Sequence, residues 1–388
     1  MITLETADNA LKSFYLDAVT EALDLKANPL LAQIQKTSAN VVGKDVKKIV
    51  RLGMSGGISA GTETGALPTA SASDRVVFTT TLKNLYGTIE ISDKALRASA
   101  GNEGAFVNLL NDEMQTLIKS ASLNFGRMLY GNGSGYLAMV SGVDTPSNIA
   151  LSDLNNVVEG MIVDFHRASG APVEGAHGVR VVSVKREESI VKFDRDVGDY
   201  VQSGDEMYIQ GSKDNELTGL GAIFENDTLY GVDRTENTLL KPYKRTGVGE
   251  ITEEILQKAI DDIEMKSGEK VNFIVCAWGV RRALMSYYRE FKTMMPSLEI
   301  NGGYTAISFN GIPIVADRFC PDGTMYLLNT DSFKINQLCD WKWLEGEDGK
   351  ILKQIPGKPV YTATLVKYAE LMCEKPQAQG VLTGITHK

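Results

Sequence analysis

Apolar side chains recur every three or four residues over 102–130, and this pattern predicts the clearest helix of the chain. Asn102 is a candidate N-cap, and Gly131 is a candidate terminator of the helix. About 27 residues at ~1.5 Å each would form a rod of roughly 40 Å. That is more than twice the average length of helices in globular proteins, so we expect this helix to span the molecule.

Between residues 41 and 92, two segments alternate between apolar and polar positions with the period of two that is typical of strands. The stretch 53–68 between them is rich in glycine and too poor in large side chains to pack a core. We therefore predict two long strands joined by a flexible tip. Such an arm is marginal alone and needs a surface to lie on, either a partner or, as the alternative, its own domain. The candidate assembly residues of the tip are Gly53, Gly56, Gly57, Gly61, Gly65 and Pro68.

The first 36 residues contain a short amphipathic helical pattern that includes Leu11, Phe14 and Tyr15. Asn28-Pro29 breaks the pattern, because the residue before proline is disfavoured in a helix. Nothing nearby in the sequence can cover the apolar side of this segment. We therefore expect Leu11, Phe14 and Tyr15 to lie against another part of the fold or against another subunit, which makes them candidate assembly residues.

Short apolar runs alternate with turn clusters over 155–245, and this spacing predicts a small antiparallel barrel or sandwich. Over 250–335 the pattern returns to mixed helices and strands, including a helix that ends at Ser267-Gly268. A strand from Val360 to Met372 follows, and Pro376 separates it from the short tail. Together these segments predict an α+β protein.

The composition is that of an ordinary globular protein, with 388 residues of which 43% are hydrophobic and 23% are charged. That length corresponds to roughly two or three domains. No apolar run long enough to span a bilayer and no secretory signal is visible in the sequence. The net charge is −9, and lysine and arginine are not clustered. Sequence-specific nucleic-acid binding is therefore not expected, although an acidic wall is compatible with a container for DNA.

Candidate chemistry is sparse. The glycine stretch 131–135 follows a predicted helix, whereas a phosphate-binding loop needs a strand before it and a helix after it, so we interpret it as a helix-ending turn. No nucleophile elbow or SxxK motif occurs.

The cysteines lack metal-ligand spacing and are interpreted as small buried residues, and the three histidines have no partner at a motif spacing. The acidic doublets Glu253-Glu254 and Asp261-Asp262 are interpreted as the wet face of a helix. Trp341 and Trp343 could form an aromatic platform, but a strand face at an interface is the preferred interpretation. We predict no catalytic residue, no cofactor and no metal site, and therefore no enzyme.

Taken in order, four stretches of the chain resemble the major capsid proteins of tailed bacteriophages, which have the Hong Kong 97 fold. These are 85–93 before the long helix, 127–135 closing it, 309–317, and 368–376 with its strand–proline ending. The resemblance covers nearly the whole chain and depends on the order of the stretches, since none of them is specific alone. The unit at 155–245 is larger than the minimal fold requires and is expected to be an insertion.

The resemblance implies the following division of the chain: an N-terminal arm (1–36), an E-loop hairpin (37–91), a peripheral domain with the spine helix (92–137 and 336–375), and an axial domain (138–335 and 376–388) that includes the β-rich insertion at 155–245. It implies a protein that self-assembles into hexamers and pentamers of an icosahedral shell, within a virion that is built in the bacterial cytoplasm. The implied partners are further copies of the chain, packaged DNA bound without sequence specificity, and portal and decoration proteins. Because the chain begins almost directly at the arm, the resemblance implies either a separate scaffolding protein or none. No membrane is implied.

Two alternatives remain open at this point. An encapsulin-type nanocompartment shares the fold and encloses an enzyme instead of a genome, although the large insertion and the long hairpin disfavour it. A hydrolase or nucleotide-binding enzyme without a recognisable motif is the alternative from another class.

Overall fold

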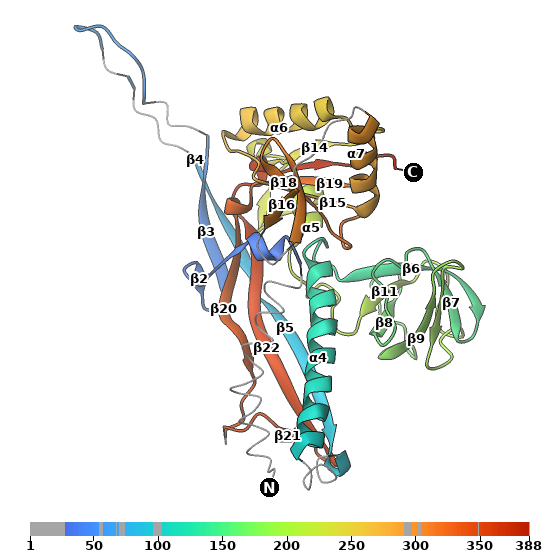
Figure 1. Ribbon diagram of the computed structural model, residues 1–388. Coiled ribbons are helices and arrows are strands. Elements are labelled where there is room, and N and C mark those ends of the chain that lie inside the picture. Colours follow the sequence, from blue (N-terminus) through green and yellow to red (C-terminus); the bar gives the residue numbers. More distant parts are fainter. Residues whose placement is uncertain are drawn as a thin grey trace. The chain divides into compact units, whose positions relative to one another are not determined.

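The computed structural model of the chain describes residues 28–53, 57–66, 68–69, 74–95, 103–290, 297–300, 304–347 and 349–387. The chain divides into two compact units, one made of 1–126 and 223–388 and the other of 127–222 (Figure 1). The unit boundaries fall within helix α4 (Glu103–Met128) and helix α5 (Leu220–Glu225).

A mixed sheet forms one core of the first unit. Its strand order is β14 (Tyr243–Arg245), β23 (Gly380–Leu382), β19 (Met325–Leu328), β15 (Phe273–Cys276), β18 (Ile312–Ala316), β17 (Tyr304–Phe309) and β16 (Ser297–Ile300). The pairs β14–β23 and β15–β18 are parallel, and the other neighbours are antiparallel. All four residues of β15 are buried, as expected for an apolar run in the middle of a covered sheet.

Two helices accompany this sheet, α6 (Glu253–Ser267) and α7 (Trp278–Glu290) (Figure 1). Thr252 caps the N-terminus of α6, because its hydroxyl accepts a hydrogen bond from the Ile255 backbone N–H at 3.3 Å. It ends at Gly268, which has a φ of +70°. Glycine adopts this left-handed conformation without the clash of a Cβ, so the predicted end of the helix is confirmed.

A second sheet of the first unit contains the two longest strands of the described chain. Its order is β1 (Gln35–Thr37), β20 (Phe333–Trp343), β22 (Val360–Cys373) and β21 (Lys353–Gln354), and β5 (Lys83–Ser92) also pairs with β22. The β5–β22 ladder is antiparallel and runs from Lys83↔Ala369 to Ser92↔Val360. The predicted strand over 360–372 is thus confirmed.

Helix α4 runs beside β5 and β22 (Figure 1), and it confirms the long helix predicted over 102–130. Its 26 residues correspond to roughly 39 Å at ~1.5 Å per residue. A Cβ atom at Gly87 of β5 would lie only 2.8 Å from Leu117 Cδ1 of α4, so a side chain at this position would force the end of the Leu117 side chain to move. Phe125 packs edge-on against Trp341 of β20, with ring centroids 5.8 Å apart. The candidate N-cap, Asn102, lies outside the described residues.

A three-stranded sheet of β2 (Val41–Val42), β3 (Asp45–Leu52) and β4 (Asp74–Thr81) contains the predicted hairpin. The antiparallel β3–β4 pairing confirms that two strands flank the glycine-rich tip. The far side of the hairpin is not one long strand, however. It breaks at Leu82, whose backbone N–H donates to Lys44 O at 2.9 Å, and the chain then enters β5 in the other sheet.

The described part of the first unit also contains short elements. Strands β12 (Thr228–Leu229) and β13 (Val232–Asp233) pair with each other, and the 3-10 helices are η3 (Leu31–Gln33), η4 (Thr238–Leu240), η5 (Thr330–Ser332) and η6 (Pro376–Ala378).

The second unit is built around a closed β-barrel (Figure 1). Around the barrel the strands are β10 (Ile190–Phe193), β7 (Asn148–Leu151), β6 (Tyr136–Thr145), β11 (Glu206–Ile209), β8 (Ile162–His166) and β9 (Val179–Lys185). Alternate residues of these strands point inward, and Phe165 and Phe193 meet edge-on in the interior at 5.5 Å between ring centroids. A barrel is therefore present where the turn spacing indicates one. Its strands run from Tyr136 to Ile209, so they begin and end earlier than the predicted segment 155–245.

The bounds differ because the first barrel strand, β6, follows the long helix directly after the turn at 131–135. This turn is the glycine stretch that we interpreted as helix-ending, and Gly131 N–H donates to Met128 O at 3.2 Å. The compact unit ends at residue 222, so 223–245 belongs to the first unit. In the second unit, a buried ion pair joins Arg127 to Glu216, with side-chain exposures of 6% and 2%.

The predicted interface role of the two tryptophans is wrong. Trp341 and Trp343 are each 5% exposed in the single chain, so their own unit already covers them. The cysteine prediction holds for Cys276, Cys320 and Cys373, which are buried, whereas Cys339 is half-buried. Burial raises the pKa of the Cys276 thiol to about 12, and a buried thiol of this kind is chemically inert.

Candidate assembly surfaces

The β3–β4 hairpin has one covered face and one open face. On the covered face, Phe78 is 1% exposed and packs against Tyr230, with ring centroids 5.3 Å apart. The Thr79 backbone N–H donates to Tyr230 O at 2.9 Å, and Lys48 forms an ion pair of 2.9 Å with Glu374. For this face the alternative of a hairpin that lies on its own domain is correct.

The open face of the hairpin combines apolar and cationic side chains. Ile49 and Val77 are directly opposite each other in the register and are 61% and 51% exposed. Arg51 and Arg75 form the next outward pair, also directly opposite. Two like charges at opposed positions destabilise an isolated ladder. A surface that is both apolar and doubly cationic suits a partner with an apolar patch and acidic groups.

The tip of the hairpin is exposed along most of its described length. Gly57, Gly61, Gly65 and Pro68 lie there without regular secondary structure, and Gly53 follows β3 with a φ of +68°. A φ of this sign favours glycine, so the chain can leave the strand here at little steric cost. Gly56 lies outside the described residues. The assembly role of these six positions stays a prediction.

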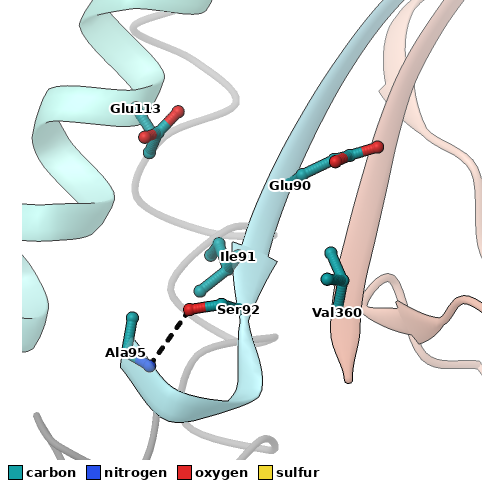
Figure 2. Close-up of a pocket in the computed structure, with 6 residues that line it drawn as sticks. All are labelled: Glu90, Ile91, Ser92, Ala95, Glu113 and Val360. Atoms are coloured by element: carbon teal, nitrogen blue, oxygen red, sulfur yellow. Dashed lines mark hydrogen bonds between the residues drawn. The ribbon is translucent and has the colours of Figure 1, made fainter. Parts of the chain in front are cut away.

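A small pocket lies at the far end of β5 from the hairpin, beside helix α4 (Figure 2). It has a volume of about 350 Å³, and Ile91 and Val360 provide apolar walls. Glu113 of α4 points towards β5, whereas the neighbouring Glu90 of β5 points away from α4, to the other face of the strand (Figure 2). Its rim is ordered by a 3.2 Å hydrogen bond that the Ala95 backbone N–H donates to Ser92 Oγ. The pocket thus combines an apolar wall with the carboxylate of Glu113, and the carboxylate of Glu90 lies on the far face of the same strand. An apolar surface with acidic groups close by is the complement of the open face of the hairpin.

The described chain begins at a buried anchor. Asn28 is fully buried, and its Nδ2 donates to Asp317 Oδ2 at 2.6 Å while its Oδ1 accepts from Leu30 N at 2.8 Å. Leu30 is also fully buried. Sequence reasoning treated Asn28-Pro29 only as a helix breaker, and no local signal pairs Asn28 with a residue 289 positions away. Leu11, Phe14 and Tyr15 lie outside the described residues, so their role stays a prediction.

A charged clasp fixes the next segment to the long sheet. Asp340 accepts hydrogen bonds from Lys36 Nζ at 2.7 Å and from Lys367 Nζ at 2.9 Å. Burial disfavours the charged form of Asp340, but the hydrogen bonds from Lys36 and Lys367 outweigh it and lower the pKa of Asp340 well below its usual range. The segment that follows the N-terminal 27 residues is therefore attached at two points, the Asn28 anchor and this clasp.

In the barrel unit, aromatic and imidazole rings form a row that sequence reasoning missed. His166 lies 6.0 Å from His177 and 5.2 Å from Tyr208 between ring centroids, and Tyr208 donates to Glu206 at 2.6 Å. Burial and then the hydrogen bond to Glu206 raise the pKa of Tyr208 well above its ordinary value. Within the described ranges, no group of three or more His, Cys, Asp or Glu residues could hold a metal ion. None of the described helices combines the length and apolar character needed to cross a bilayer.

Comparison with known proteins identifies the fold but not a sequence family. No protein-family model matches the chain, and no curated protein matches it. Among solved structures, a chain of the cyanophage A-1(L) capsid asymmetric unit matches over 97% of this chain and 94% of its own, with a TM-score of 0.56 at 13% identity. A chain of the satellite phage P4 procapsid, which includes the size determination protein, matches over 96% and 99% with a TM-score of 0.47 at 12% identity. A chain of the holo-SrpI encapsulin complex from Synechococcus elongatus matches over 93% and 89% with a TM-score of 0.46 at 9% identity.

The cyanophage match extends over nearly the full length of both chains, and its TM-score is above 0.5. The chain therefore has an α+β capsid-protein fold. The resemblance to phage capsid proteins that the sequence indicates is confirmed at the level of the fold.

Proposed function

We propose that the chain is the major capsid protein of a tailed phage or prophage, which self-assembles into the shell around the genome. The observation that carries the proposal is the near full-length likeness to a chain of the cyanophage A-1(L) capsid. Fold alone does not determine function. The surfaces of this chain therefore have to support the proposal independently.

The open face of the hairpin gives that support. It leaves Ile49, Val77, Arg51 and Arg75 outward on a part of the chain that acts as an E-loop in this proposal. An exposed apolar pair beside two cations that face each other is unfavourable in a lone subunit and becomes favourable when an acidic, partly apolar surface covers it. In a shell, that surface would belong to the peripheral part of a neighbouring copy.

The pocket between α4 and β5 is the proposed acceptor for the hairpin. Glu113 offers an acidic group, and Ile91 and Val360 offer the apolar surface. Glu90 adds a second carboxylate on the other face of β5. Because the donor face and the acceptor pocket are on the same chain but differ from each other, the contact is heterologous. Contacts of this kind join copies head to tail, and they generate rings when the rotation from copy to copy closes.

The finer parts of the proposal follow the implied division of the chain. The arm over 1–36 reaches beneath another subunit from its anchor at Asn28, the axial domain gathers around the capsomer axis, and the barrel is an insertion in it. Hexamers and pentamers, the location in the virion, and the scaffolding, portal and decoration partners belong to the same proposal. The absence of catalysis is also part of it.

Purification of the full chain, followed by size-exclusion chromatography with light scattering and negative-stain electron microscopy, tests the proposal. We expect megadalton hollow particles, and particles from producing cells should protect DNA from nuclease. Particles that hold a protein cargo and no nucleic acid would indicate the encapsulin-type alternative instead. A small compact oligomer with enzymatic turnover would overturn the shell function altogether.

A further inference from the structure

Helix α7 carries a stripe of side chains that is exposed in the part of the chain that the structure describes. Trp278, Arg282, Met285 and Arg289 follow each other at steps of four, three and four residues, so they share one face of the helix. Trp278 is 58% exposed and Met285 is 36% exposed, and both arginines are exposed. Within the described ranges, neither arginine forms an ion pair. A tryptophan and a methionine between two arginines is the composition of an interface rather than of an ordinary solvated face.

Helix α6 carries a second exposed stripe of opposite charge. Glu254, Lys258, Asp261 and Met265 also follow each other at steps of four, three and four residues. All four are exposed, and Met265 is 83% exposed, the second-highest value among the exposed large apolar side chains of the described chain. Asp261 accepts a 2.7 Å hydrogen bond from Gln257, one turn earlier on the same helix. The acidic doublets that sequence reasoning treated as a wet face therefore end beside a large exposed apolar side chain.

The two stripes match when one helix is read in the opposite direction. Along α7, Arg282 lies four residues after Trp278, and Arg289 lies seven residues after Arg282. Along α6 in the reverse direction, Asp261 lies four residues before Met265, and Glu254 lies seven residues before Asp261. At ~1.5 Å per residue these steps are about 6 Å and about 10 Å on both helices. Antiparallel packing would therefore bring together one apolar pair and two opposite-charge pairs.

The fourth pair of residues that the two stripes would bring together, Met285 and Lys258, is also compatible with packing of the helices. Met285 would lie opposite Lys258, whose aliphatic stem can cover an apolar side chain while its ammonium group stays in water. Antiparallel side-by-side helices also have opposed macrodipoles, which is the favourable arrangement.

We propose that the exposed stripe of α7 docks antiparallel on the exposed stripe of α6 of a second copy of this chain. The proposal rests on the proposed shell function and names one contact that would hold neighbouring copies together. A second copy is the occupant because the chain itself supplies the complementary charges in the same spacing. The contact is heterologous, since each copy gives α7 to one neighbour and receives α7 from another on α6, and such a contact forms a ring when the rotation from copy to copy closes.

Charge exchange between the helices tests this contact in the full chain. One variant reverses α7 (Arg282→Glu with Arg289→Glu), a second reverses α6 (Glu254→Arg with Asp261→Arg), and a third combines all four changes. Each reversal alone would place like charges together, so we expect the particle yield to fall at least tenfold. The combined variant restores opposite charges and should recover most of the yield.

Matched controls separate this contact from general effects of charge. Arg180→Glu and Glu187→Arg change exposed residues of the barrel unit and should leave the particle yield unchanged. All of the changed positions are on the surface, so we expect every variant to fold. Circular dichroism of each variant checks this.

Two outcomes overturn the helix contact without touching the shell function: folded single reversals that assemble like the unmodified chain, or a combined variant that stays deficient. The second outcome would mean that α7 docks on an acidic partner other than a further copy. An unmodified chain that forms no particles in the same series would instead contradict the shell function. A 1:1 mixture of the two single reversals gives an additional readout. Copies of the two variants that alternate around a ring have opposite charges at every contact in a six-membered ring, but not in a five-membered ring. We therefore expect the mixture to recover six-membered rings and not five-membered rings.

Discussion

Replacement of the exposed apolar pair on the hairpin is the most informative perturbation of the proposed subunit contact. Ile49→Thr combined with Val77→Thr keeps both side chains β-branched, so the strands β3 and β4 retain residues that favour the extended backbone. Both positions point away from the covered face that packs on Tyr230. The change therefore removes apolar surface from the proposed contact and leaves the folded chain intact.

The expected magnitude follows from the exposure of the two side chains. Full burial of an isoleucine or valine side chain contributes about 1.5–3 kcal/mol. Ile49 and Val77 still expose 61% and 51% of their surface, so a neighbour that covers them gains roughly 1–2 kcal/mol from each. Threonine retains part of that gain, and the double change should weaken each contact by about 2 kcal/mol, which corresponds to about 30-fold in affinity.

The assay is the concentration at which particles form, measured by light scattering on the purified full chain. The double variant should need a markedly higher concentration, while its thermal unfolding as a subunit shifts little, because exposed positions usually change stability by less than about 0.5 kcal/mol. Val182→Thr is the matched control, since Val182 is a 47% exposed valine on a strand of the barrel. Equal assembly of the double variant and the control would refute the role of this face.

Two further predictions concern the points that attach the start of the described chain. Asn28→Ala should lower the free energy of unfolding by about 2 kcal/mol, because it removes the buried amide that donates to Asp317, and an unchanged Tm would contradict the anchor. Asp340 has a lowered pKa in the folded state, so its contribution to stability is present above the unfolded value of about 3.9 and is lost as the pH falls below it. The Tm of Asp340→Asn should accordingly be lower than that of the unmodified chain at pH 7, and this difference in Tm should narrow below about pH 4. A difference in Tm that is the same at all pH values would show that the ion pairs of Asp340 with Lys36 and Lys367 do not cause the loss of stability.

The parts of the fold that could be predicted from sequence are those with a strong local period. Helix α4 and helix α6 have clear apolar stripes, and the strands at 304–309, 312–316 and 360–373 have clear turns or a proline at their ends. Each of these elements is determined within a short window by side-chain periodicity and by a glycine or proline signal. Their order along the chain was enough to indicate the capsid-protein fold.

The errors arose where the outcome depends on residues far apart in the sequence. The break at Leu82 between β4 and β5 is set by which sheet each strand joins, because both halves keep the same period of two. Trp341 is covered by Phe125 on a helix more than 200 positions earlier. The anchor between Asn28 and Asp317 likewise joins distant residues. No local pattern carries information of this kind.

The candidate surfaces show the same limit. The tip glycines can be recognised from composition, but the complementary features can be recognised only after folding. The hairpin register places Ile49 beside Val77, and the packing of α4 beside β5 places Glu113 near Ile91. The pairing of strands and the packing of helices decide which side chains remain exposed to solvent, and both depend on the whole fold.

A cryo-electron microscopy map of particles assembled from the purified full chain tests the central claim most directly. The account predicts a closed shell in which the open face of the β3–β4 hairpin lies against the α4–β5 pocket of an adjacent copy. A chain that remains monomeric, or a particle in which that face is left in contact with solvent, would contradict it.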